Sequence, residues 1–495
     1  MGRFGLAVIS LAGMCAIASA NGRPAATSTI NFEQGNPQHI VAGMTFGLLL
    51  SDDGGTTWHW MCEKNVGYGG LYDPDYAYSP TGAIFATTFN GLKVMRDGCS
   101  FKCATEPCNC STTKTVSCTV DADCPVPDPM RPDVHELCAG EFVSQDELGP
   151  SAALHYAAAD PNDAKIYTST NDGMSFPTMA APGMANDWWD SMIVAPSNPM
   201  RIYLTGYRLA SGQPKAFLFF KSNDGGATFT AMSIDGIATT NSSTVDIVSV
   251  DAVNPDIVYA HVSFETSAGG DSIYKSTTGG GTAAQTGQWT KILSMNDPFG
   301  LVFLIRSNGD LVAATQTLGA VKSTVGAACT NTTTCAWQDL PSPPHINCLV
   351  NNPATLATTH EVWACTHNYD SPGISGDGYG IMKTTDLVTW TPVLRYQDIA
   401  GPVDCPVGTV QHDQCVESYM AKPSVWCCLE AQLGITAPFD CTGARDCGIQ
   451  PDSPIDAGNT MVKPPKGCCS TGGSGAGFML LALGTGVMLW RRRKR

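Results

Sequence analysis

The sequence predicts an all-β fold, a seven-bladed β-propeller with a disulfide-rich insertion and a small Cys-rich module after it. Two observations predict this class: a turn motif that occurs seven times, and an apolar strand pattern that recurs in phase with it. The composition agrees with them. Only 15% of the residues are charged, against about 25% in a typical soluble protein, and no long amphipathic helical pattern stands out in this Gly-rich chain.

The turn motif is clearest in SDDGGTTW (51–58), which sets the template. SNDGGATF (222–229) matches every defined position, STNDGMSF (169–176) has asparagine in the place of aspartate, and VMRDGCSF (94–101) keeps the glycine and the aromatic residue. Three more divergent copies end in tryptophan. The final aromatic residues are 43, 75, 53, 60, 48 and 53 positions apart, and the longest interval holds a Cys-rich run. The residues assigned to the motif are Ser51, Asp53, Gly55, Thr57, Trp58, Asn171, Gly173, Phe176, Ser222, Asp224, Gly226, Thr228, Phe229, Trp289, Trp337 and Trp390.

The chemistry of the motif indicates a tight turn between the two outer strands of a blade. An aspartate carboxylate can accept backbone N–H groups inside such a turn, and glycine supplies a conformation that other residues resist. The final aromatic residue can bury its ring against the sheet. Because one motif repeated seven times cannot be a single active site, we interpret these residues as structural.

The strand pattern runs in phase with the turns. Each motif follows a turn and an apolar strand, as in SNPMRIYLTGY and NPDIVYAHVSF. A repeat therefore consists of four strands in about 50 residues, which is typical of a propeller blade. The propeller is predicted over 28–398, with a Cys-rich insertion at 99–141. The third repeat is short, and the sequence leaves open whether its blade is complete.

These turns resemble the Asp-box (BNR) repeat of the sialidase superfamily, sortilin-type receptors, xyloglucanases and photosystem II assembly-factor-like propellers. The resemblance implies a propeller, but that superfamily mixes hydrolases with binding scaffolds. Sialidases need an arginine triad whose first member lies in an R-I-P-type motif before the first box. Here only Arg23 precedes that box in the mature chain, and Pro24 follows it. Sialidase activity is therefore not expected, and xyloglucanases have two propellers where this chain has length for one.

Both ends of the chain look like sorting signals. Residues 1–20 have a basic start, an apolar run and small residues ending at Ala20, as in a secretory signal peptide. Segment 467–495 contains 20 uncharged residues (471–490) followed by five basic ones, which predicts a membrane span with the basic end inside. With Cys468 and Cys469 before it, this layout resembles a MYXO-CTERM signal. That resemblance implies a sorting protease and retention at the cell surface or outer membrane, through the segment or a lipid; a plain anchor is the alternative.

The cysteines agree with export. Outside the two terminal segments there are eighteen, in three even-numbered groups: eight between 62 and 138, four between 329 and 365, and six between 405 and 447. An even count in an exported protein favours disulfides. Cys329–Cys335 and Cys348–Cys365 are predicted local pairs. Residues 405–447 are predicted to form a compact module with three disulfides of its own, and 448–466 a Pro/Asp-rich linker.

The charge excludes one class of partner. The net charge is −16, and it becomes −22 without the six basic residues of the terminal segments. Such a protein repels phosphate backbones, so nucleic acid is not an expected partner. No cofactor and no metal site are predicted. Asp121 and Asp123 of the insertion could contribute to a structural calcium site, but two carboxylates fall short of the six to eight oxygens that calcium prefers.

The candidate site lies at the mouth of the propeller, on the loops that lead into the innermost strands. Asp190 and Asp246 each precede an Asn-Pro turn by eight residues, so they occupy equivalent positions in adjacent blades. A carboxylate pair beside aromatic residues is what a glycosidase would use. Equally, aspartates at strand starts cap turns, and a tryptophan beside a strand usually packs. The ligand-binding candidates around the pair are Trp188, Trp189, Tyr72, Asp73 and His345.

The sequence therefore favours an exported, surface-tethered propeller that acts as a non-catalytic binding or adhesion module for a polysaccharide or a surface protein. A secreted glycoside hydrolase that uses Asp190 and Asp246 is the first alternative. An envelope assembly scaffold is the second.

Overall fold

The computed structural model describes residues 25–435, except for 69–72, 89–90, 105–107, 110–116, 119–136, 139–141, 149–153, 161–162, 185–186, 211, 268, 298–299, 372–373 and 417–423. The predicted signal peptide, linker and sorting segment lie outside these residues, as does Tyr72. Within the described part, no helix is long and apolar enough to cross a membrane.

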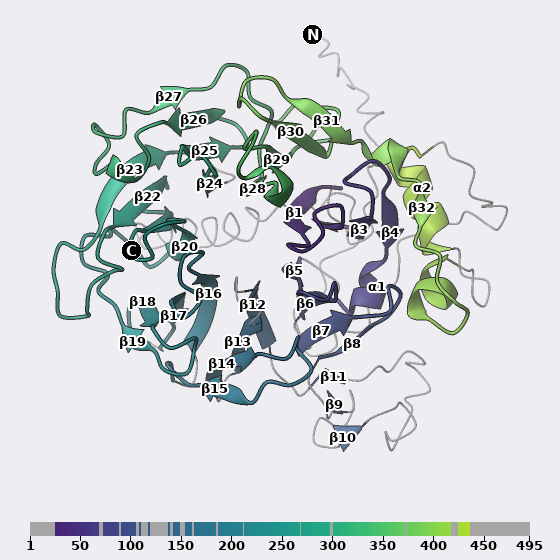
Figure 1. Cartoon of the computed structure of the whole chain (residues 1–495), viewed down its shortest axis with the longest axis horizontal. Coiled ribbons are helices and arrows are strands. Elements are labelled where there is room, and N and C mark those ends of the chain that lie inside the picture. The colour runs from purple at the N-terminus through teal and green to yellow at the C-terminus, as the bar shows by residue number, and fades with distance from the viewer. Residues whose placement is uncertain are drawn as a thin grey trace, which may run out of the picture.

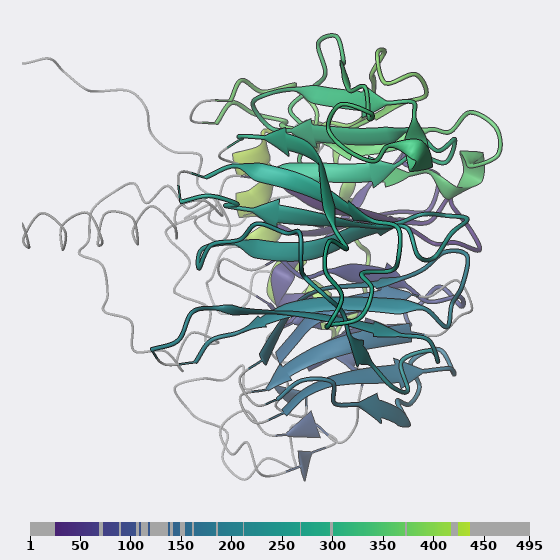
Figure 2. The same cartoon turned by 90° about the vertical axis from the view of Figure 1, so that its left-hand side faces the viewer.

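Seven sheets stand side by side around a central axis, each with its first strand innermost (Figure 1). Figure 2 shows the same ring from the side, with the strands running roughly from one face to the other. Within each sheet the strands follow sequence order, and consecutive strands pair antiparallel. This is the predicted β-propeller.

The sequence predicts four strands in each repeat, and one sheet differs from this. Six sheets have four strands, whereas the N-terminal sheet has five, because β32 from the C-terminal side adds parallel to β4. The third repeat, despite its short sequence, forms four strands. The five-stranded sheet consists of β1 (Thr27–Phe32), β2 (Ile40–Met44), β3 (Gly47–Ser51), β4 (His59–Met61) and β32 (Gly401–Pro402).

The other sheets follow in chain order. The next two are β5 (Tyr76–Tyr78), β6 (Ile84–Thr88), β7 (Gly91–Met95) and β8 (Phe101–Cys103), then β12 (Phe142–Leu148), β13 (Leu154–Asp160), β14 (Asp163–Ser169) and β15 (Thr178–Ala180). The fourth and fifth are β16 (Asp187–Val194), β17 (Ile202–Arg208), β18 (Ala216–Ser222) and β19 (Thr230–Ala231), then β20 (Thr244–Val250), β21 (Val258–Ser263), β22 (Asp271–Ser276) and β23 (Thr290–Met295). The last two are β24 (Leu301–Ile305), β25 (Leu311–Thr315), β26 (Ala320–Ser323) and β27 (Gln338–Asp339), then β28 (Cys348–Asn351), β29 (Val362–Cys365), β30 (Ile381–Thr384) and β31 (Thr391–Leu394).

The remaining elements are short. In the Cys-rich insertion, β9 pairs with both β10 and β11 in a three-stranded sheet. Helix α2 lies beside the outer edge of the five-stranded sheet (Figure 1). The bounds are β9 (Cys108–Asn109), β10 (Ser117–Cys118), β11 (Leu137–Cys138), α1 (Glu63–Val66), η2 (Gly326–Ala328), η3 (Pro353–Thr355), η4 (Tyr396–Asp398), η5 (Gln411–Val416) and α2 (Val425–Leu433).

The apolar core is divided among the interfaces between neighbouring sheets. For example, Tyr203 of β17 packs in one cluster with Val245 and Val258 of the next blade, and Tyr259 packs with Phe303 of the blade after it. The second strands β2, β6, β25 and β29 are buried at every residue, because each sheet packs against a neighbour on both faces.

The motif turns connect the third and fourth strands of their blades. In the first, Asp53 Oδ1 accepts hydrogen bonds from the backbone N–H groups of Thr56 (3.0 Å) and Thr57 (2.8 Å), and the Gly55 N–H donates to Ser51 Oγ (2.9 Å). The turns at 169–176 and 222–229 form two of these bonds, from the glycine N–H to the serine hydroxyl and from the residue before the aromatic to the Asn or Asp side chain. The aromatic ring of Trp58 is buried.

The predicted local disulfides Cys329–Cys335 and Cys348–Cys365 are both present. The prediction that 405–447 forms a self-contained module with three disulfides was wrong, because two of its cysteines bond to the propeller. Those bonds are Cys62–Cys415 and Cys99–Cys405, with sequence separations of 353 and 306. The even number of cysteines in each group could not reveal these bonds. Two disulfides between two groups use two cysteines of each, so the number left in each group is still even.

Candidate functional site

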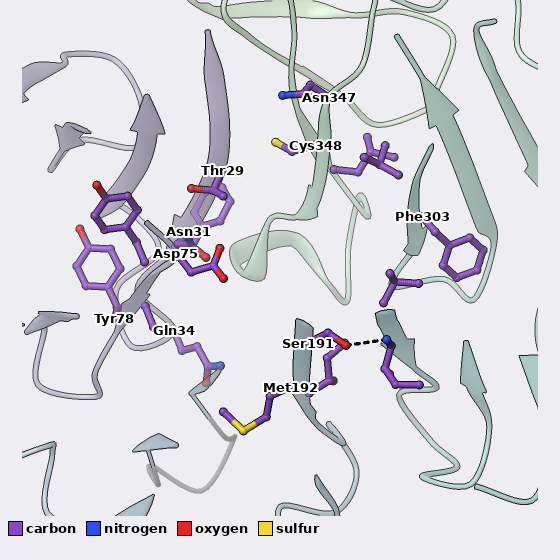
Figure 3. Close-up of a pocket in the computed structure, with 18 of the residues that line it drawn as sticks. Thr29, Asn31, Gln34, Asp75, Tyr78, Ser191, Met192, Phe303, Asn347 and Cys348 are labelled. Carbon is purple, nitrogen blue, oxygen red and sulfur yellow. Dashed lines mark hydrogen bonds between the residues drawn. The ribbon is translucent and has the colours of Figure 1, made fainter. Parts of the chain in front are cut away.

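A channel of about 550 Å³ runs between the innermost strands (Figure 3). Its described lining comes from β1, β5, β16, β20, β24 and β28 and the residues beside them. Thr29 and Asn31 are alternate residues of β1, so both face the channel, as the two-residue period of a strand requires. Gln34, Asn347 and Ser191 add further hydrogen-bonding groups to the wall, whereas the rings of Tyr78 and Phe303 point away from the channel and pack in the apolar core (Figure 3).

Asp75 is the only charged side chain of this described lining. It is the residue directly before β5, where its backbone N–H donates to Thr87 Oγ1 (3.0 Å). Its carboxylate points into the space between the strands (Figure 3). Burial raises the pKa of Asp75 to about 6, since a carboxylate loses hydration in such a place.

Asn347 is held by a polar network behind the wall. Its Oδ1 accepts from Gln316 Nε2 (2.8 Å), and its Nδ2 donates to the Thr27 carbonyl (3.2 Å). Gln316 Oε1 lies 3.0 Å from His367 Nε2, so this nitrogen carries the proton. The amide of Asn347 is therefore fixed in orientation before any ligand arrives.

His345, a predicted ligand residue, lies at the far end of the same network. Its Nδ1 is 2.9 Å from Asp377 Oδ1, and Asp377 Oδ2 accepts the backbone N–H of His367 (3.0 Å). Burial lowers the pKa of His367, and the nearby His345 lowers it further, while Asp377 opposes both. His345 thus supports the channel wall through other residues and is not part of the described lining.

Asp190 and Asp246 lie within the innermost strands of adjacent blades, β16 and β20, and not on the loops that lead into these strands, where they were predicted. Asp190 sits at a β-bulge, because β16 skips one residue between the pairs Trp189–Gly206 and Ser191–Thr205. Asp246 stands opposite His261. Neither aspartate belongs to the channel lining, to which β16 and β20 contribute the segments 191–193 and 247–248 instead.

Lys215 completes a charged cluster with the two aspartates. Its Nζ donates to the Ser243 carbonyl (2.6 Å) and lies 4.0 Å from the centre of the Tyr207 ring. It thereby spans from one blade to the start of the next. Its positive charge partly offsets the effect of burial on both carboxyl groups.

Burial raises the pKa of the two aspartates to different extents. Burial, aided by the charge of Asp246, raises the pKa of Asp190 to about 8. Burial raises the pKa of Asp246 to about 6, with His261 and Lys215 acting against it. Asp190 Oδ2 is buried and has no hydrogen-bond partner among the described residues. Burial therefore favours retention of a proton by the pair, and it acts more strongly on Asp190 than on Asp246.

The remaining predicted residues do not gather at one point. Trp189 is 3% exposed and packs edge-on against Phe220 at 6.0 Å between ring centres, so it belongs to the core. Trp188 is half-buried, and so is Asp73, before β5. The sequence analysis missed Asp75, two residues along. The signal that could have found it is the alternation of polar residues on the innermost strands, which is also visible at 29 and 31.

No group of three or more His, Cys, Asp or Glu residues that could hold a metal ion occurs in the described part of the chain. The segment that contains Asp121 and Asp123 lies outside it.

No protein-family model matches this chain. A search of curated proteins likewise finds no match. Among solved structures, an ancestral GH74 enzyme has a TM-score of 0.46 at 13% identity, over 75% of this chain and 47% of its own. The Dos1 propeller has a TM-score of 0.41 at 10% identity, over 73% and 81%. The NanB sialidase from Streptococcus pneumoniae has a TM-score of 0.33 at 10% identity, over 61% and 66%. The chain thus spans about half the length of the GH74 enzyme.

Proposed function

We propose that this protein is an exported, surface-tethered propeller that binds a glycan in its axial channel without cleaving it. The observation that carries the proposal is the channel itself, a space of about 550 Å³ with hydroxyl and amide side chains fixed on its wall. Asn31 and Asn347 carry amide groups that can both donate and accept hydrogen bonds, which suits sugar hydroxyl groups. A few preformed polar groups that converge in a concavity are typical of small-ligand sites.

Export and tethering are supported by the sequence at the two ends. The apolar run before Ala20 and the uncharged segment before the five terminal basic residues are the features that support them. A tethered propeller would hold its channel out from the cell surface, where polysaccharides are available.

The test is binding of residues 21–467, made in an oxidising host, to an array of glycans. We expect retention of at least one glycan class, and a tenfold or greater loss in Asn31→Ala, because each neutral hydrogen bond left unmade costs about 1–3 kcal/mol. Gln213→Ala is the matched control, since Gln213 is exposed on the loop after β17. Capture of a surface protein with no glycan retained would contradict the proposal.

Hydrolysis of a glycan is the second candidate, and one observation favours it. Burial raises the pKa of both carboxyl groups, and of Asp190 the more, which is the kind of difference that a general acid and a general base require. Activity would fall above about pH 8, where Asp190 loses its proton, and below about pH 6, where Asp246 gains one. New reducing ends that disappear in both Asp190→Asn and Asp246→Asn would establish it. Reducing ends that persist in both variants would exclude this pair.

A further inference from the structure

The channel carries a charge that nothing in the described structure balances. Asp75 is the single charged residue of the described lining, and its side chain forms no ion pair or hydrogen bond with any residue that the structure describes. Its pKa, raised by burial to about 6, still leaves it mostly ionised at neutral pH. A carboxylate in this position loses hydration without a compensating partner.

The most direct way to compensate such a group is a positive charge on the ligand. A metal ion fits poorly, because Asp75 is one carboxylate and calcium prefers six to eight oxygen ligands. An ammonium group needs only one carboxylate and a few neutral acceptors. Asn31 and Gln34, from the first blade, offer amide oxygens on the same side of the wall as Asp75 (Figure 3).

We propose that Asp75 makes the channel selective for a glycan that carries a free, protonated amino group, over the same glycan with its amino groups acetylated. This inference rests on the proposed glycan-binding function and names the class of sugar. An ammonium ion paired with Asp75 forms a charge-assisted hydrogen bond, about twice as strong as a neutral one. An acetylated nitrogen offers a neutral donor and brings a bulky group into the same space.

The acidic character of the whole chain acts in the same direction. Its net charge of −16 concentrates cations near the surface and speeds their arrival. That effect is not specific to the channel, so the experiment must separate it from Asp75.

The experiment is calorimetric titration of residues 21–467 at pH 6.5 with two probes of equal length, an oligomer of glucosamine and the corresponding oligomer of N-acetylglucosamine. We expect one glucosamine oligomer to bind per chain, about 10- to 100-fold tighter than the acetylated oligomer, as one additional charged hydrogen bond implies. Asp75→Asn should abolish this preference and retain the weaker binding of the acetylated oligomer.

The control is Asp339→Asn, which removes the same charge from an exposed position on β27; it should keep the preference. Should Asp75→Asn fail to fold, the wild-type protein still decides, because the preference for the glucosamine oligomer should weaken as the pH falls below about 6, where Asp75 gains a proton while ordinary surface carboxylates stay ionised. Equal affinity for the two oligomers overturns the inference, as does a preference that survives in Asp75→Asn or binding of several oligomers per chain. If the array yields only neutral glycans, the inference fails while the glycan-binding function stands; if no glycan binds, both fail.

Discussion

The turn glycines hold the blades together through contact with the neighbouring sheet as well as through their backbone conformation. Gly55 has φ +88°, and a Cβ there would lie 2.7 Å from Cη2 of Trp363 in the adjacent blade. Gly173 has φ +67°, and a Cβ there would meet the Phe85 ring at 2.3 Å. Gly98 has a similar φ of +76°, but a Cβ there would have no atom of the described residues within 4 Å. The glycine at this motif position therefore packs tightly against the neighbouring blade at 55 and 173 and has no such contact at 98.

This difference predicts two sizes of effect for one substitution. Gly98→Ala should lower the free energy of unfolding by about 1 kcal/mol, the strain of a left-handed alanine. Gly55→Ala adds a collision with a fully packed indole, so its loss should reach about 2–4 kcal/mol. Urea unfolding followed by tryptophan fluorescence measures both. Equal losses would show that the contact with Trp363 does not hold the turn.

Asp190 makes the stability of the protein depend on pH. Its pKa is about 8 in the folded chain, against an ordinary value of 3.8. The folded state therefore keeps a proton that the unfolded chain releases, and stability falls as the pH rises from about 4 to about 8. Asp190→Asn should remove that fall, which we expect to be on the order of 1–3 kcal/mol for a half-buried group. Melting curves at pH 5 and pH 8 test it, with Asp339→Asn as the control. An unchanged pH dependence in Asp190→Asn would contradict the assignment.

At the scale of the elements, basic side chains of one blade donate hydrogen bonds to backbone carbonyls in the motif turn of the next blade. Lys221 Nζ donates to the Gly279 carbonyl (3.0 Å), and Lys275 Nζ to the Cys329 carbonyl (2.7 Å). Arg306 donates to the Thr385 carbonyl in the last blade. Each of the two lysines directly precedes the serine that opens its own motif. In these two blades the motif serine stabilises the turn of its own blade. The lysine before it stabilises the motif turn of the next blade.

The lysine contact can be removed without altering the turn that it binds. Lys275 is 4% exposed, and Lys275→Met would leave the Ala327 and Cys329 carbonyls without their donor. We expect a loss of about 2–4 kcal/mol in unfolding free energy. Lys322→Met is the matched control, because Lys322 precedes the next motif serine but is only half-buried and binds no partner in the described part of the chain. A loss in the control as large as in Lys275→Met would place the effect elsewhere.

Sequence patterns predicted what depends on neighbouring residues. The motif turns, the strand order and both local disulfides follow from spacing, because Cys329 and Cys335 bracket one loop. The face of the strand on which a side chain lies was harder to predict. Trp188 and Trp189 are adjacent, yet one is half-buried and the other is 3% exposed. Asp73 was predicted at the mouth, but Asp75 is the residue that lines the channel. The exact start of β5 decides which of the two points inward.

Closure of the ring could not be predicted, because it joins residues more than 300 positions apart. After the last blade the chain returns to the first, where β32 pairs with β4. The Trp426 ring of α2 lies 5.3 Å from the Trp60 ring, and the Gln411 amide bonds both to the Trp60 carbonyl and to the Cys62 N–H. No local pattern encodes these contacts. They form only when the other blades have already brought the two ends together.

The long disulfides should accordingly stabilise the whole molecule more than the local ones. Cys62→Ser with Cys415→Ser removes one bond and leaves no free thiol. Because Cys99–Cys405 still joins the same segments, the closure that is lost is that of about 50 residues, worth about 4 kcal/mol in the chain-entropy model. Cys329→Ser with Cys335→Ser opens a loop of sequence separation 6, for which the same model gives about 2 kcal/mol. Thermal unfolding of both double variants without reductant compares them. A loss in the short pair equal to or greater than that in the long pair would mean that β32, Trp426 and Gln411 close the ring without covalent help.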